Sequence, residues 1–233
     1  MSRLYAVARR RQGRYVSIAM ETAGRVRGRP RSFDREAALE RAMLLFWEHG
    51  YEATSLAQLT AAMGIGAPSL YAAFGDKQAL FLAAVDRYVA RGGADTQSLM
   101  GDAKTAREAV AQFLEASALR LTNPHFPRGC MVVLAAVSCS EEAAPVQHKL
   151  AACRAAWEKG LRQCIERGIA DGEVPAITNA AALASFYMAV VQGMSLHAKD
   201  GATRKRLQEI AETALLAWPA GPPRKKARRA RPS

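Results

Sequence analysis

Hydroxyl-bearing and small residues gather between positions 54 and 76 of this 233-residue chain, and a lysine follows them at position 77. Thr54 and Ser55 precede one short apolar segment, and Lys77 begins a later one. Hydroxyl groups and free amides at a helix N-terminus suit an oxyanion such as phosphate, and an anion opposite Lys77 would explain a lysine at that positive helix end. The small residues between them leave a helix slim enough to enter a groove about 12 Å wide. The chemistry that these residues predict is contact with nucleic acid.

The sequence carries none of the usual catalytic constellations: no phosphate-binding loop, no nucleophile with a base partner and no paired carboxylates in a plausible cleft. Its four cysteines form no C-x-x-C pair, and no spacing of His, Cys and Asp suggests a structural metal site. We therefore expect no catalytic residues, no cofactor and no metal. The thiols are expected to be reduced, as in a cytoplasmic protein.

The net charge of +12 is concentrated at the two ends of the chain. Residues 1–31 carry a net charge of +8, residues 222–233 carry +6, and the chain between them is near neutral. We expect two disordered basic segments, an arm over 1–31 and a tail over 221–233, that meet a polyanion. In the arm, Arg27, Arg29 and Arg31 alternate with Gly and Pro and suit a narrow minor groove. The alternatives are a linker that only raises the local positive charge, and tails that only keep the protein soluble.

Capping and breaking residues divide the intervening sequence into helices. Asp34 begins the first helix and Gly50 ends it, while Gly92-Gly93 is expected to break the fourth. The predicted helices cover residues 34–50, 55–63, 67–74, 76–92, 105–121, 130–138, 145–168, 179–199 and 203–218. The sequence therefore predicts an all-α fold, with a first domain over 32–92 and a larger second domain over 94–219.

The second and third predicted helices have the features of a helix-turn-helix over about residues 56–75. Gly64 permits the chain to reverse, and Ile65 fills the gap between the two helices. Pro68 in the first turn of the third helix costs no hydrogen bond, because the missing donor would be unpaired there anyway. In such a motif the third helix lies in the major groove of DNA.

The stretch from Gly28 to Val89 resembles the DNA-binding domain of the tetracycline-repressor (TetR/AcrR) family. The resemblance rests on residues 50–55, which read GYEATS, and on residues 63–77, which read MGIGAPSLYAAFGDK. It implies an N-terminal helix-turn-helix domain followed by a larger helical ligand-binding and dimerisation domain. Weaker similarity continues in Arg128-Gly129-Cys130-Met131 and in Gln192-Gly193-Met194-Ser195.

The family pattern also implies which residues contact DNA. With the arm included, the expected DNA-binding residues are Arg27, Arg29, Arg31, Thr54, Ser55, Gly66, Ala67, Pro68, Ser69, Tyr71, Ala72 and Lys77. Gly66 departs from the pattern, because many members have Ser or Thr there, although glycine is an acceptable helix cap. The structural alternative is that Tyr71 packs in the core and that Lys77 is a solvated surface lysine.

One face of the predicted helix over 179–199 is apolar and rich in small residues, which suits a four-helix interface with a second copy of the chain. The expected interface residues are Ala182, Phe186, Ala189, Val190 and Gly193. The alternative is that this face packs only within one chain. The uncharged stretch 174–197 is also long enough to test as a membrane span, but its polar residues favour a buried bundle helix.

A ligand pocket is expected among the helices between Thr105 and Gly168. Its predicted lining residues are Phe113, Cys130, Met131, Leu134, Cys153 and Trp157. The alternative is that these residues form ordinary core. Cys130, near a predicted helix start, is a candidate thiol sensor, with an inert buried cysteine as its alternative.

These expectations combine into a ligand-responsive transcriptional regulator, a repressor that binds a palindromic operator as a homodimer and is released by a small-molecule effector. Its expected partners are double-stranded DNA, that effector and a second copy, with no membrane, and its expected location is the cytoplasm at the nucleoid. Two alternatives stay open: an architectural nucleoid protein without sequence choice, and a helical enzyme without a recognisable motif.

Overall fold

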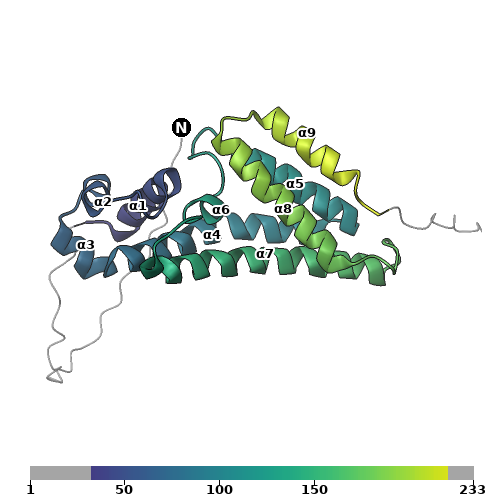
Figure 1. Cartoon of the computed structure of the whole chain (residues 1–233), viewed down its shortest axis with the longest axis horizontal. Helices are drawn as coiled ribbons and strands as arrows, with labels where there is room; N and C mark the ends of the chain where they lie inside the picture. The colour runs from purple at the N-terminus through teal and green to yellow at the C-terminus, as the bar shows by residue number, and fades with distance from the viewer. Residues whose placement is uncertain (1–32, 220–233) are drawn as a thin grey trace, which may run out of the picture. The chain divides into compact units, whose positions relative to one another are not determined.

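The computed structural model describes residues 33–219, which fold entirely into helices and turns (Figure 1). The helices are α1 (Arg35–His49), α2 (Leu56–Met63), α3 (Ala67–Phe74), α4 (Lys77–Asp102), α5 (Ala106–Leu121), α6 (Met131–Leu134), the 3-10 turn η1 (Glu141–Ala143), α7 (Ala144–Ala170), α8 (Ala180–Lys199) and α9 (Arg204–Leu215). The predicted all-α fold is confirmed for this part of the chain. The expected arm, with Arg27, Arg29 and Arg31, and the expected tail over 221–233 lie outside the described residues.

Helix starts follow the capping residues in the sequence. The Asp34 carboxylate accepts hydrogen bonds from the Glu36 and Ala37 amides. Ser55 and Gln58 form a reciprocal capping box at the start of α2. Asp76, Thr105, Asn179 and Thr203 each accept a bond from an amide in the first turn of α4, α5, α8 and α9. Each such cap satisfies a backbone donor that has no partner within the helix.

The expected break at Gly92-Gly93 is wrong, because α4 continues to Asp102. A glycine inside a helix costs only about 1 kcal/mol relative to alanine, and packing can offset that cost. Here α4 packs against α1, α5 and α7. Gly92 also makes room for a neighbour, since a Cβ there would lie 3.1 Å from Nη1 of Arg120. A single helix therefore runs from the first group of helices into the second, across the predicted boundary between 92 and 94.

Helix α6 is shorter than the predicted helix over 130–138 and ends at Leu134. The carbonyl of Ala135 accepts a hydrogen bond from the Tyr51 amide at 2.7 Å, which ties this turn to the end of α1. Helix α9 ends at Leu215, and tight turns continue to Trp218. In both places tertiary contacts or a tightened last turn replace helical hydrogen bonds.

A continuous core joins α1 to α4 with the remaining helices. Phe46 packs edge-on to Phe81, with ring centroids 4.9 Å apart, and Trp47 packs in the same way against Tyr88. Trp47 also stacks on Phe126 of the loop after α5. Aromatic pairs of this kind contribute roughly 0.5–1.5 kcal/mol beyond their buried area. The core of the helix-turn-helix region is thus continuous with the core formed by α5 to α9.

Helix α8 is long and apolar enough, by length and composition, to cross a membrane, and it is the one described helix with that property. It packs against α5, α6, α7 and α9 (Figure 1). Its inner face is buried and includes Tyr187, Met188, Val191 and Met194. Packing of this inner face in the bundle accounts for part of the apolar composition, and the opposite face of α8 is exposed.

Candidate DNA interface and effector cavity

The turn between α2 and α3 has the geometry of a helix-turn-helix. Gly64 adopts a left-handed conformation, with φ 69° and ψ 33°, which favours glycine. The next amide, on Ile65, donates to the Thr60 carbonyl at 3.1 Å, and Arg41 of α1 donates through Nη1 to the Met63 carbonyl at 3.1 Å. Ile65 is half-buried and packs against the core. The turn is therefore fixed by backbone geometry and by α1.

Helix α3 buries one face and exposes the other. Leu70 is fully buried and Phe74 nearly so, while Tyr71 is 49% exposed. The exposed face comprises Ala67, Pro68, Tyr71 and Ala72, with Gly66 exposed at the cap and Ser69 half-buried. The alternative in which Tyr71 packs in the core is wrong. A slim, solvent-facing helix face of this kind fits the dimensions of a DNA major groove.

Thr54 does not belong to this exposed surface. Its side chain is fully buried, and its hydroxyl donates to the Gly50 carbonyl at 2.6 Å. Ser55 is exposed and supplies the cap of α2. The expected phosphate contact by the Thr54 hydroxyl is therefore corrected: this hydroxyl holds the end of α1 against the start of α2. The Ser-x-x-Gln signature at 55–58 singled out Ser55 as the cap.

Lys77 stands in the first turn of α4, close to the α1–α2 connection. Its Nζ lies 4.5 Å from the centroid of the Tyr51 ring and 3.4 Å from the Glu52 carbonyl oxygen. The Glu52 carboxylate accepts the Ser140 amide at 3.0 Å, and that bond lowers the pKa of Glu52. The aromatic ring and the carbonyl hold the ammonium group beside the connection between α1 and α2.

Ion pairs join α1 to α4, the two helices that flank the helix-turn-helix in the sequence. Arg87 donates to Glu40 at 2.6 Å and to Glu36 at 2.7 Å, and Arg91 donates to Glu40 at 2.5 Å. Partial burial acts to raise the pKa of Glu40, but the hydrogen bond from Arg87 and the charges of both arginines outweigh it, so the pKa is lowered. The Arg91 guanidinium also lies 4.3 Å from the centroid of the Phe126 ring. Arg91 thus contacts both α1 and the loop after α5.

The two weakly family-like segments of the second domain meet in space. The Cys130 amide donates to the Ser195 hydroxyl at 2.8 Å. Arg128 donates through Nε to the Ala198 carbonyl at 2.9 Å and through Nη2 to the Ala202 carbonyl, at the C-terminal end of α8. An arginine at that end also interacts favourably with the helix dipole. The sequence singled out both segments without predicting that they touch.

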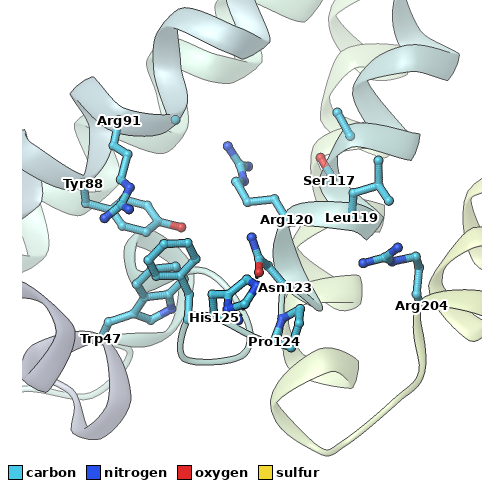
Figure 2. A pocket seen from close by; sticks show the side chains of 13 residues that line it. Trp47, Tyr88, Arg91, Ser117, Leu119, Arg120, Asn123, Pro124, His125 and Arg204 are labelled. Carbon is cyan, nitrogen blue, oxygen red and sulfur yellow. Dashed lines mark hydrogen bonds between the residues drawn. The ribbon is translucent and has the colours of Figure 1, made fainter. Parts of the chain in front are cut away.

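Two neighbouring cavities share part of their lining: the outer one lies between α1, α4, α5, the loop that follows α5 and the start of α9, and the inner one lies between α4, α5, α6, α7 and α8. The outer cavity has a volume of about 660 Å³ (Figure 2). Its lining residues are Trp47, Tyr88, Arg91, Gly92, Ala116, Ser117, Leu119, Arg120, Asn123, Pro124, His125, Phe126 and Arg204. A smaller cavity of about 20 Å³ lies further in, and Tyr88, Gly92 and Arg120 line both.

Three of the six residues predicted to line a ligand pocket lie at one of the two cavities, and three do not. Phe113, Cys130 and Trp157 line the inner cavity. Met131, Leu134 and Cys153 lie outside both linings; Met131 is buried in the core, where it packs α6. The cavities also take residues from α1, α4 and α8, which sequence analysis missed. Arg120 carried a signal, because it follows Phe113 and Ser117 at the spacing of one helix face.

Cys130 is 1% exposed, and its sulfur accepts a hydrogen bond from the Tyr88 hydroxyl at 3.4 Å. Burial raises the pKa of the Tyr88 phenol well above its ordinary value. Burial also raises the pKa of Cys139, Cys153 and Cys164. All four cysteines are free thiols. These surroundings favour the inert buried cysteine over the candidate sensor at Cys130.

The expected dimer face of α8 is exposed on the single chain. Ala182, Phe186, Ala189 and Gly193 are exposed and Val190 is half-buried, with Phe186 at 41%. A shallow hollow of about 400 Å³ lies between Phe186 and Val190 of α8 and Ile210 and Thr213 of α9. The alternative in which this face packs within one chain does not hold. Among the described residues no group of three or more His, Cys, Asp or Glu side chains is placed to hold a metal ion.

A helix-turn-helix followed by a larger helical domain is the architecture of a DNA-binding transcriptional regulator. The family described as "Bacterial regulatory proteins, tetR family" matches residues 38–84, and "Tetracyclin repressor-like, C-terminal domain" matches residues 106–214. The chain belongs to the TetR family of bacterial transcriptional regulators.

Relatives of known name are similar over most of their length. The HTH-type transcriptional repressor ComR of Escherichia coli is 41% identical, over 83% of this chain and 92% of ComR. The HTH-type transcriptional repressor BdcR of Escherichia coli is 30% identical, over 83% of this chain and 91% of BdcR. A cysteine mutant of the TetR family transcriptional regulator CifR, solved with 26bp double-strand operator DNA, is 47% identical with a TM-score of 0.80, over 82% of this chain and 100% of that one.

Proposed function

We propose that this protein is a homodimeric transcriptional repressor that binds a palindromic operator through α3 and is released by a small-molecule effector. The observation that carries the proposal is the outward face of α3, with Tyr71 49% exposed beside the small Ala67 and Ala72. A dimer through the exposed face of α8 would present two such helices about 34 Å apart, one turn of DNA. Because the proposed operator is part of chromosomal DNA, the protein would act in the cytoplasm, at the nucleoid.

Release by an effector requires that the ligand bind the form unsuited to DNA more tightly than the DNA-binding form. The outer cavity is well placed for such an effect, because its lining includes Trp47 of α1 and Arg91 of α4. Arg91 is paired with Glu40 of α1, and Trp47 donates through Nε1 to the Gly129 carbonyl at 3.1 Å. A molecule in the cavity would touch the contacts that hold α1 against α4.

The test of operator binding is selection of a site from random DNA, followed by titration of that site and of a scrambled copy. Strong preference for the selected site supports a repressor with sequence choice. Equal binding to both sequences would contradict it and leave an architectural DNA-binding protein.

We expect Lys77→Gln to weaken operator binding and to lower the salt dependence of that binding, by about one in the slope of log K against log salt. The reason is that a lysine on phosphate releases a counterion on binding, whereas its contacts with Tyr51 and Glu52 do not. The measurement is fluorescence anisotropy at several salt concentrations, with Lys159→Gln on the exposed surface of α7 as the control. If the slope of log K against log salt is unchanged in Lys77→Gln, Lys77 does not contact a phosphate.

We expect Ser69→Ala and Ala67→Leu to change which bases are preferred, because both residues stand in the first turn of α3. The measurement is repeated site selection with each variant, with Ser138→Ala, an exposed serine outside the helix-turn-helix, as the control. If the selected site stays the same for both α3 variants, base recognition lies elsewhere.

A further inference from the structure

We infer that the effector is an organic monoanion: an apolar body that carries one carboxylate, with Arg120 as its anchor. This inference rests on the proposed function and names the chemical class of the molecule that the cavity accepts. The argument begins with Arg120, which lines both cavities at the point where they meet.

Arg120 is a cation without its usual partners. Its Nε is buried and donates no hydrogen bond, and no described carboxylate forms an ion pair with its guanidinium. A buried charge or donor without a partner is costly, and proteins usually pair such a group. Figure 2 shows the Arg120 side chain between the helix of Tyr88 and Arg91 and the helix of Ser117 and Leu119. The missing partner is best supplied by a ligand in the cavity.

The charges around the cavity have one sign. Arg91, Arg120, His125 and Arg204 line the outer cavity, and no Asp or Glu is among the described residues that line either cavity. Arg91 is already paired with Glu40. Arg204 has no ion pair either, but it is exposed to solvent, whereas Arg120 is half-buried and its Nε has no hydrogen-bond partner. Arg120 is therefore the partly desolvated cation without a counterion in the cavity, and one such cation is matched by one negative charge. The planar guanidinium matches a carboxylate through two parallel hydrogen bonds.

The remaining walls are apolar and partly aromatic. Trp47, Leu119, Pro124 and Phe126 line the outer cavity, and Phe113 and Trp157 continue this surface into the inner one. A cavity of about 660 Å³ is in the range that binds drug-sized molecules. Such walls favour an aromatic ring or an alkyl chain over a sugar or a highly charged phosphate ester.

The experiment compares carboxylates with their primary amides, which keep the shape and remove the charge. Phenylacetate, 2-naphthoate and decanoate, and the three matching amides, are titrated into the full chain. Binding is followed by calorimetry and by the fluorescence of its three tryptophans, of which Trp47 and Trp157 line the cavities. We expect at least one carboxylate to bind about tenfold to a hundredfold more tightly than its amide. Equal binding of every acid and amide, or no binding by any of the three acids, overturns the inference.

The variant Arg120→Gln should reduce binding of that carboxylate to the level of its amide, and Arg120→Lys should restore part of the difference. Arg162→Gln, which removes one positive charge from an exposed pair with Glu166 on α7, should leave the difference unchanged. A preference for the acid that survives Arg120→Gln overturns the role of Arg120. Operator binding is measured in the same samples without ligand. If the unmodified chain binds the operator but binds acids and amides equally, only this inference is rejected. If the unmodified chain does not bind an operator, the proposed function is rejected.

Discussion

Replacing Gly193 with leucine is expected to convert the dimer into monomers and to weaken operator binding by roughly a hundredfold, because two linked half-site contacts become independent. Gly193 is exposed on α8, and a Cβ there meets nothing within 4 Å on its own chain. Leucine is also the better helix former, by nearly 1 kcal/mol. The folded monomer should therefore be at least as stable as before, and any loss must come from a partner that approaches this face closely.

Gly160→Leu on α7 is the matched control, since a Cβ at Gly160 also meets nothing within 4 Å. Sedimentation velocity gives the oligomeric state of both variants, and anisotropy gives their operator affinity. Gly160→Leu should remain a dimer with full affinity. A dimeric Gly193→Leu would place the interface elsewhere, and a monomer with unchanged affinity would separate dimer formation from operator recognition.

Gly129→Ala is expected to lower the free energy of unfolding by about 3 kcal/mol, the sum of a left-handed backbone and an overpacked site. Gly129 has a φ of 82°, and an added Cβ would lie 2.6 Å from Cδ1 of Leu134 and 2.9 Å from the Ser195 carbonyl oxygen. Leu134 can shift, but the Ser195 carbonyl belongs to the backbone of α8. The substitution should thus push the loop after α5 away from α8.

Gly172→Ala separates the two causes, because Gly172 has a φ of 71° and a Cβ there meets nothing within 4 Å. It should cost only about 1 kcal/mol, from backbone strain alone. Thermal unfolding of both variants measures the difference: roughly 2–4 °C per kcal/mol is expected for a chain of this size. Equal losses at the two positions would contradict close packing at Gly129.

The helix-turn-helix could be predicted from sequence because its determinants are local. The Ser55 cap, the left-handed Gly64 and the alternation of buried Leu70 with exposed Tyr71 all depend on residues a few positions apart. Thr54 shows the limit of that reasoning. Its hydroxyl type suited a phosphate, but the fold turns it inward onto the Gly50 carbonyl, and only the packing of α1 against α2 decides this.

The cavity could be predicted only in part because it is formed by segments far apart in sequence. Phe113 and Trp157 were found from their apolar character, but Tyr88 and Arg91 were assigned to the first domain. That assignment followed from reading Gly92 as a helix end. In the structure the space that Gly92 leaves is filled by the Arg120 guanidinium, a tertiary contact that local propensity does not report.

The continuity of α4 constrains the length of the chain as well as its residue types. About 22 Å of helix axis separates Lys77 from Gly92, at 1.5 Å per residue. Each residue added or removed between them would rotate one end relative to the other by about 100°. Lys77 would then leave the start of α2 while Arg91 stayed beside the cavity. An insertion or a deletion in this part of α4 is therefore expected to uncouple the position of Lys77 from that of Arg91, even where every substituted residue still favours a helix.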